Sequence, residues 1–152
     1  MILSTHALFE WLVGLHIATG TVGLVVVWIP IAGKKGGVLH KRAGIIFVQS
    51  MIATGSTAVA ISLTTLSDPT GTHPHLAQHD IFRDPQAITN IFGWMMLYLA
   101  TLTINLAWQG WLSLRNGRDH RLNRAWHNLL SQALLTAVST NCLARGVIAE
   151  EP

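Results

Sequence analysis

Three histidines and an aspartate lie within one short polar segment of the chain. These residues are His73, His75, His79 and Asp80. Imidazole and carboxylate groups are ligands that Zn and Cu both accept. No H-E-x-x-H signature and no cysteine pair accompanies them. The cluster indicates a candidate metal site, and a polar loop at a membrane surface is the alternative interpretation.

Histidines elsewhere in the chain are candidates for binding b-type haem or a quinone. His16 lies in a segment without charged residues, where an ionisable group is by default a functional candidate. A bis-histidine haem needs two histidines at one depth, and no second histidine is expected beside His16. His40 and His127 lie near the starts of two apolar segments and can form such a pair at the other interface. The candidate cofactor residues are therefore His16, His40 and His127, and a hydrogen-bonded structural histidine is the alternative for His16.

Four long segments without Asp, Glu, Lys or Arg must position these residues. They cover 11–33, 43–67, 85–114 and 125–144. A helix needs about 20 apolar residues to cross the hydrocarbon core of a bilayer. The pattern predicts an all-α polytopic membrane protein, a single transmembrane domain over 1–152. Its four spans are expected at about 9–31, 44–66, 87–114 and 125–148.

Basic residues are concentrated in two of the connections. Eight of the ten Lys and Arg residues lie in 33–43 and 115–124, whereas the other connection and the chain ends carry most of the acidic residues. By the positive-inside rule these two loops are cytoplasmic, and the loop 67–86 and both termini lie outside, in the periplasm. The basic excess thus reflects topology, and no nucleic-acid partner is expected.

Each predicted span carries a stripe of small or polar residues at helical spacing. The stripes comprise His16, Thr19, Gly20 and Gly23; Ser50, Thr54, Gly55 and Thr57; Trp94, Tyr98, Thr101 and Asn105; and Asn128, Gln132, Thr136, Ser139 and Thr140. Helices in lipid associate through small residues and polar contacts. A compact four-helix bundle with the stripes turned inward is therefore predicted, with Gln132 and Thr136 buried against protein.

Part of the chain resembles a known family. The runs Leu15-His-Ile-Ala-Thr-Gly20, Gly33-Lys-Lys-Gly-Gly37 and His40-Lys-Arg-Ala-Gly44 carry the resemblance. They are similar to a widespread family of small bacterial integral membrane proteins of unknown function. The similarity covers roughly residues 12 to 60 and implies a location in the bacterial inner membrane, without implying an activity.

Two functions from different classes follow from these patterns. Short loops, small-residue faces and the lack of a paired catalytic set favour a non-catalytic accessory or scaffold subunit of a larger membrane complex. Its expected partners are the lipid bilayer and either other membrane subunits or further copies of the chain. The alternative is a small redox membrane protein that binds b-type haem or a quinone.

Overall fold

A computed structural model describes residues 4–116, 119, 121 and 124–149. The predicted all-α class is confirmed, because this part of the chain forms helices and turns without a strand. The helices are α1 (Thr5–Val26), α2 (Trp28–Ala32), α3 (Val38–Ser67), α4 (Pro69–Thr72), the 3-10 turns η1 (Leu76–Gln78) and η2 (Asp80–Phe82), α5 (Pro85–Ile88), the π-helical η3 (Thr89–Met95), α6 (Met96–Asn116) and α8 (Trp126–Ala149).

Three of the long helical segments are long and apolar enough to cross a membrane. They are Thr5–Ala32, Val38–Ser67 and Pro85–Asn116, the last of which joins α5, η3 and α6. The fourth long helix, α8, is less apolar and is not among them. Polar residues such as Gln132, Asn141 and Arg145 lower its hydropathy.

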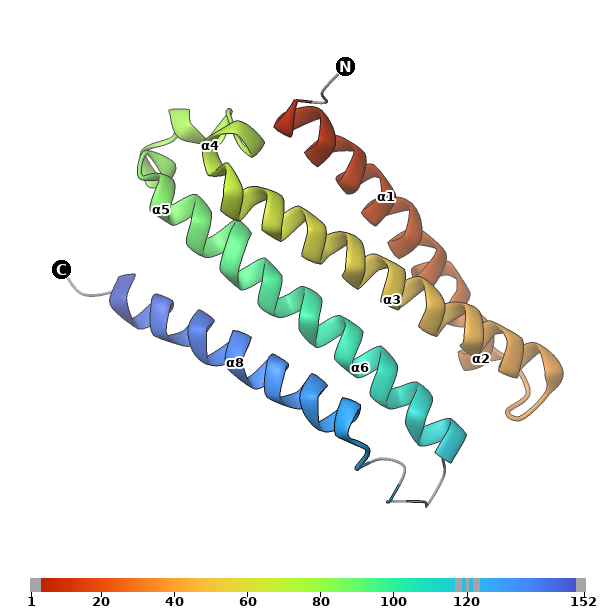
Figure 1. Cartoon of the computed structure of the whole chain (residues 1–152). Helices are drawn as coiled ribbons and strands as arrows, with labels where there is room; N and C mark the ends of the chain where they lie inside the picture. Colours follow the sequence, from red (N-terminus) through yellow and green to blue (C-terminus); the bar gives the residue numbers. More distant parts are fainter. Residues whose placement is uncertain (1–3, 117–118, 120, 122–123, 150–152) are drawn as a thin grey trace.

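The long helices form an open row. The cartoon shows α1, α3, α6 and α8 side by side in this order, with α1 and α8 at the two edges (Figure 1). Helix α1 packs on α3, α3 packs on α6, and α6 packs on α8. The described start of α1 and end of α8 lie at one end of the row, together with α4 and α5 (Figure 1). The predicted closed bundle is therefore replaced by a row in which each long helix packs on its neighbours.

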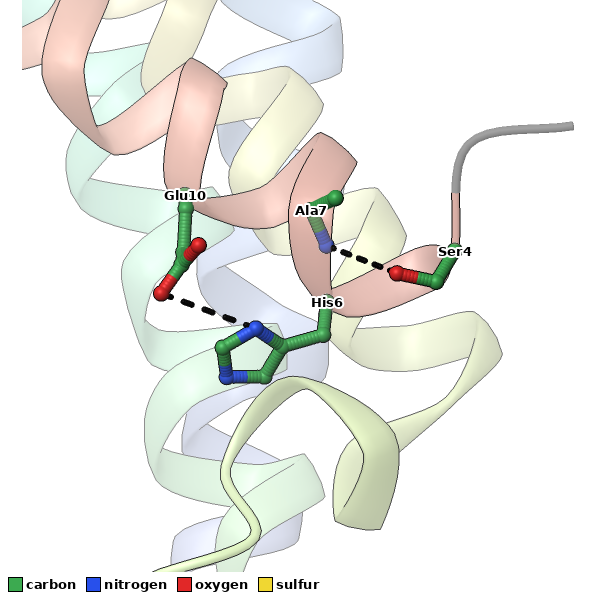
Figure 2. A network of polar contacts seen from close by, with 4 residues as sticks. All are labelled: Ser4, His6, Ala7 and Glu10. Carbon is green, nitrogen blue, oxygen red and sulfur yellow. Dashed lines mark hydrogen bonds and ion pairs between the residues drawn. The ribbon is translucent and has the colours of Figure 1, made fainter. Parts of the chain in front are cut away.

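Local hydrogen bonds define the helix ends. Figure 2 shows the start of α1, where the Ser4 hydroxyl accepts from the Ala7 amide at 3.3 Å. One turn further, His6 lies 3.6 Å from Glu10 (Figure 2). Ser4 directly precedes the first helical residue, and its side-chain oxygen thus satisfies one of the free backbone amides at the start of α1.

The α1–α3 contact uses the predicted stripes. Nδ1 of His16 lies 3.1 Å from the Thr54 carbonyl oxygen, and the Thr54 hydroxyl lies 3.0 Å from that of Thr19. Gly23 is buried against Ser50, whose Oγ would lie 3.0 Å from a β-carbon at the glycine. The prediction that these faces meet is confirmed, because small residues bring the helix backbones together and polar side chains bond between them.

The α6–α8 contact is polar as well. The Trp108 indole donates to Oδ1 of the Asn128 side chain at 3.0 Å, and the Gln132 amide donates to Asn105 Oδ1 at 2.9 Å. Asn105 in turn donates to the Ser131 backbone carbonyl at 3.3 Å. Asn105 and Asn128 are buried, so these bonds anchor the first half of α8 on α6.

The predicted burial of Gln132 and Thr136 is wrong for the single chain, in which both residues are exposed. The reason is the place of α8 at the edge of the row, where only one face has a helix to pack on. Gln132 reaches Asn105 from the rim of that contact. The Thr136 hydroxyl donates to the Gln132 backbone carbonyl oxygen at 2.9 Å, so it needs no partner on another helix.

Replacement of Gly55 should separate α3 from α6. A β-carbon at Gly55 would lie 2.5 Å from Ile104 Cγ1 and 3.2 Å from the Ala100 carbonyl oxygen. Gly55→Ala is expected to cost about 1–3 kcal/mol of unfolding free energy, as overpacking does in cores. Thermal or denaturant unfolding in detergent measures the loss. Gly110→Ala is the control, because a β-carbon there meets nothing within 4 Å. Equal stability of the two variants would contradict the close α3–α6 contact.

Candidate functional site

A cavity of about 350 Å³ lies along α3 between α1 and α6. Its lining comes from α1 (Phe9, His16), α3 (Thr54, Gly55, Ala58, Ile61, Ser62, Thr65), the segment after α4 (His73), η3 (Phe92) and α6 (Met96, Leu99, Ala100, Thr103). Gly55, Ala58 and Ala100 leave room where larger side chains would fill the space. The walls are mainly apolar, with a few polar groups at fixed places, which is the usual composition of a small-molecule site.

His16 presents a hydrogen-bond acceptor at the cavity. Its Nδ1 lies 3.1 Å from the Thr54 carbonyl oxygen and 3.4 Å from the Thr57 hydroxyl. A carbonyl oxygen only accepts hydrogen bonds, so Nδ1 of the neutral imidazole carries the proton. The other ring nitrogen, Nε2, then has a free lone pair. No described residue is bonded to it.

His73 lies at the other end of the cavity. Its Nδ1 lies 3.0 Å from the Thr72 hydroxyl, whose single proton also has the Asp68 and Pro69 carbonyl oxygens within reach, at 2.9 and 3.1 Å. Both tautomers of the His73 imidazole satisfy these contacts, so Nε2 can either donate or accept a hydrogen bond. The imidazole lies between Phe9 and Phe92, at ring-centroid distances of 5.0 and 4.6 Å.

The two histidines mark opposite ends of the cavity. His73 contacts Phe9, whereas His16 lies seven residues further along α1, a rise of about 10 Å. Two axial nitrogens on one iron have to lie about 4 Å apart, since imidazole–metal bonds are about 2 Å long. This pair suits a ligand with polar groups at both ends better than one shared iron atom.

Thr65 adds an unsatisfied donor to the same lining. Its residue surface is 0% exposed, and its Oγ1 has no hydrogen-bond partner among the described residues. Its neighbours behave differently: Ser62 donates to the Ala58 carbonyl at 2.9 Å, and Thr64 donates to that of Ala60 at 2.8 Å. A buried hydroxyl without a partner is destabilising by about 1–3 kcal/mol, so Thr65 is a natural contact for a bound molecule.

The residues of the predicted metal cluster separate in the structure. His73 turns to the aromatic rings and the cavity, whereas His75, His79 and Asp80 are exposed. Asp80 pairs instead with Arg83 at 3.2 Å. Within the described part of the chain, no three His, Cys, Asp or Glu side chains lie close enough together to hold a metal ion.

The predicted His40–His127 pair is not brought into one cavity. His40 lines a second cavity with residues of α6. His127 is exposed at the start of α8, with its ring 6.0 Å from that of Trp126. Helix α8 packs on the far side of α6, away from α3, so the row itself separates the two histidines (Figure 1).

Sequence reasoning missed the approach of His73 to the cavity of His16. The signal was Asp68-Pro69-Thr-Gly71, in which Asp68 Oδ1 accepts from the Gly71 amide at 2.9 Å and starts α4. Pro69 at the first helical position favours the same turn. This turn leads the chain back to the start of α1, where the His73 imidazole packs against the ring of Phe9.

Comparison of the chain with protein-family models, with curated proteins and with solved structures finds no match.

His73 should make the protein less stable in weak acid. His73 lies outside the long helices, and burial lowers its pKa below the ordinary value of 6.5, an effect that a hydrogen bond to the Pro69 backbone partly opposes. Between the lowered pKa and 6.5, the unfolded chain binds a proton that the folded protein does not bind. The neutral imidazole of His73 therefore makes its full contribution to the free energy of unfolding above pH 6.5. This contribution is lost as the pH falls through the pKa that His73 has in the folded protein.

The measurement is thermal unfolding in detergent on the two sides of this pH window. His73→Phe keeps a ring between Phe9 and Phe92 and should remove part of the acid-dependent loss of stability. His75→Phe, in the same loop but exposed, should leave the loss unchanged. Identical pH profiles for wild type and His73→Phe would refute the assignment.

Proposed function

We propose that the chain crosses a bacterial inner membrane four times, with both termini in the periplasm. Three helical segments are apolar enough to cross, and α8 runs back along α6 for a comparable length. The end of the row with the basic loops, 33–43 and 115–124, would face the cytoplasm by the positive-inside rule. The cavity of His16 and His73 then opens in the periplasmic half of the bilayer.

In this setting the function supported best is the binding of a quinone in that cavity. The observation that carries the proposal is the placement of two imidazoles, those of His16 and His73, at the two ends of one mainly apolar cavity. A quinol has hydroxyl groups on opposite sides of its ring and an apolar body. These hydroxyls can therefore donate to His16 and His73, while the ring lies against the small residues of α3.

The hydrogen-bonding chemistry agrees with this ligand class. The hydroxyls of a quinol donate to an imidazole Nε2 that lacks a proton. The carbonyl oxygens of a quinone accept, and the Thr65 hydroxyl, which lacks a partner among the described residues, would donate to one of them once the ligand has opened the lining around this buried residue. The site thus offers both roles, and α1 and α6 form its two apolar walls.

A b-type haem remains the competing ligand. The rise of about 10 Å along α1 from Phe9 to His16 disfavours His16 and His73 as axial partners on one iron. A reduced-minus-oxidised visible spectrum of the purified protein separates the two ligands. A sharp b-type band at stoichiometric occupancy would replace the quinone by haem, whereas solvent-extractable quinone in a sample without that band supports the proposal.

Thr65→Val should weaken quinone affinity about 2- to 10-fold, the effect of one lost hydrogen bond. Binding is measured by titrating a short-chain quinone into protein reconstituted in phosphatidylcholine nanodiscs. Thr64→Val is the matched control, since this adjacent threonine bonds to its own helix and does not line the cavity. His16→Leu should reduce the affinity for the quinol, titrated under reducing conditions, because it removes the acceptor of one quinol hydroxyl.

Failure of saturable quinone binding in the wild type would overturn the proposal. Equal loss in Thr65→Val and Thr64→Val would show that the effect is on the helix and not on the ligand.

A second role, as an accessory subunit of a larger assembly, is favoured by the outer face of α8. Thr136 and Thr140 are exposed on α8, beyond Gln132, whose amide bonds to Asn105 of α6. Polar groups that face hydrocarbon are unfavourable, and α8 is the least apolar of the long helices. Another membrane subunit or a second copy of the chain would remove this face from lipid.

A photo-crosslinking residue in place of Thr136 should therefore capture a protein neighbour in native membranes. The control position is Ile17 of α1, which is exposed at the opposite edge of the row. An adduct of twice the chain mass identifies a second copy, and other masses identify a different subunit. Lipid adducts alone at position 136 would contradict the accessory role.

A further inference from the structure

A second cavity lies at the other end of the row, where α3 begins and α6 ends. Its volume is about 550 Å³. One part is polar and basic, with His40 and Lys41 from the start of α3 and Arg115 from the end of α6. The other part is apolar, with Ile45 and Leu114.

The charges in this cavity have no counter-charge among the residues that the structure describes. Lys41 and Arg115 take part in no ion pair within the described part of the chain. Asp119 is the one carboxylate among the described residues at this end, and it lies in the connection between α6 and α8, exposed. Two cations that converge without a carboxylate favour an anionic ligand.

The start of α3 adds to the positive potential. Its N-cap residue is Gly37, which offers no side chain to the free amides, and no acidic residue lies in the first turn. A helix start carries a partial positive charge and unsatisfied N–H groups. Gly36, with a φ of 79°, makes the turn before it and lines the same cavity.

His40 is an unexplained polar group at this place. Its Nδ1 is buried and has no hydrogen-bond partner among the described residues. A buried ring nitrogen without a partner is destabilising, and the imidazole that carries it is part of the cavity lining. This observation is independent of the charges and indicates that a polar ligand atom belongs there.

The apolar part of the lining identifies the rest of the ligand. Leu114 is 80% exposed and Ile45 is 40% exposed. Trp111 lies next to them in the lining, and an indole prefers the depth of the membrane interface. A free inorganic anion would leave these side chains without contact, whereas an acyl chain would cover them.

We infer that this cavity binds an anionic phospholipid, whose phosphate lies at His40, Lys41 and Arg115 and whose acyl chain runs along Ile45 and Leu114. The lipid would cover the gap between α3 and α6 at the basic end of the row. This site is separate from the cavity of His16 and His73, so its existence does not depend on quinone binding.

The test compares two charge-matched double variants in nanodiscs. Lys41→Gln with Arg115→Gln removes both cations of the cavity. Arg121→Gln with Arg124→Gln removes two exposed cations of the same basic end that do not line it. Native mass spectrometry counts the lipids retained per protein in discs of phosphatidylcholine with a minor fraction of phosphatidylglycerol.

Wild type and the control variant should each retain phosphatidylglycerol in preference to phosphatidylcholine. The cavity variant should lose this preference about 10- to 30-fold, since each of the two basic residues near a membrane surface contributes a factor of about 3 to 5. Unfolding temperatures in pure phosphatidylcholine discs must match between the two variants, so that a folding defect is recognised. Equal retention of phosphatidylglycerol by both double variants would refute the proposed lipid site.

Competition with inorganic phosphate distinguishes a lipid from a free anion. A lipid site should keep its phosphatidylglycerol at millimolar phosphate. Displacement of the lipid by phosphate, or phosphate binding in pure phosphatidylcholine discs with the same sensitivity to the cavity variant, would replace the lipid by a free anion.

Discussion

The contact of His16 with Thr54 is the interaction on which the rest of the structure depends. The Thr54 carbonyl accepts from the imidazole, and the Thr54 hydroxyl joins Thr19 to Ser50 within the same contact. In lipid, helices gain little from apolar burial and are held by such polar contacts and by small residues. One contact therefore fixes α1 on α3, selects the tautomer of His16 and sets one end of the cavity.

The open row follows from where these polar contacts occur. Each is made between helices that follow one another along the chain, from His16–Thr54 to Trp108–Asn128. Nothing comparable joins α1 to α8, so the row does not close. Two consequences follow: the groove between α1 and α6 stays available for a ligand, and the outer face of α8 keeps exposed polar groups that suit a protein neighbour.

The two cavities differ in chemistry because they lie at opposite ends of the row. The first combines two imidazoles and a buried hydroxyl with apolar walls. The second combines cations and an uncapped helix start with exposed leucine and isoleucine. A few polar groups in apolar walls suit a molecule dissolved in the bilayer, and cations at the interface suit the headgroup of an anionic lipid.

The sequence by itself determined the helices, the three strongly apolar segments and the small and polar faces of α1 and α3, because these are properties of residue order and helical period. It also indicated His16 as a candidate. Only the tertiary structure decided that His73 lies at the cavity of His16, that Thr65 lacks a partner among the described residues, and that His40 and His127 are apart. These outcomes depend on how a capped turn at Asp68 leads the chain back and on which helices become neighbours, and neither is encoded in the period of one helix.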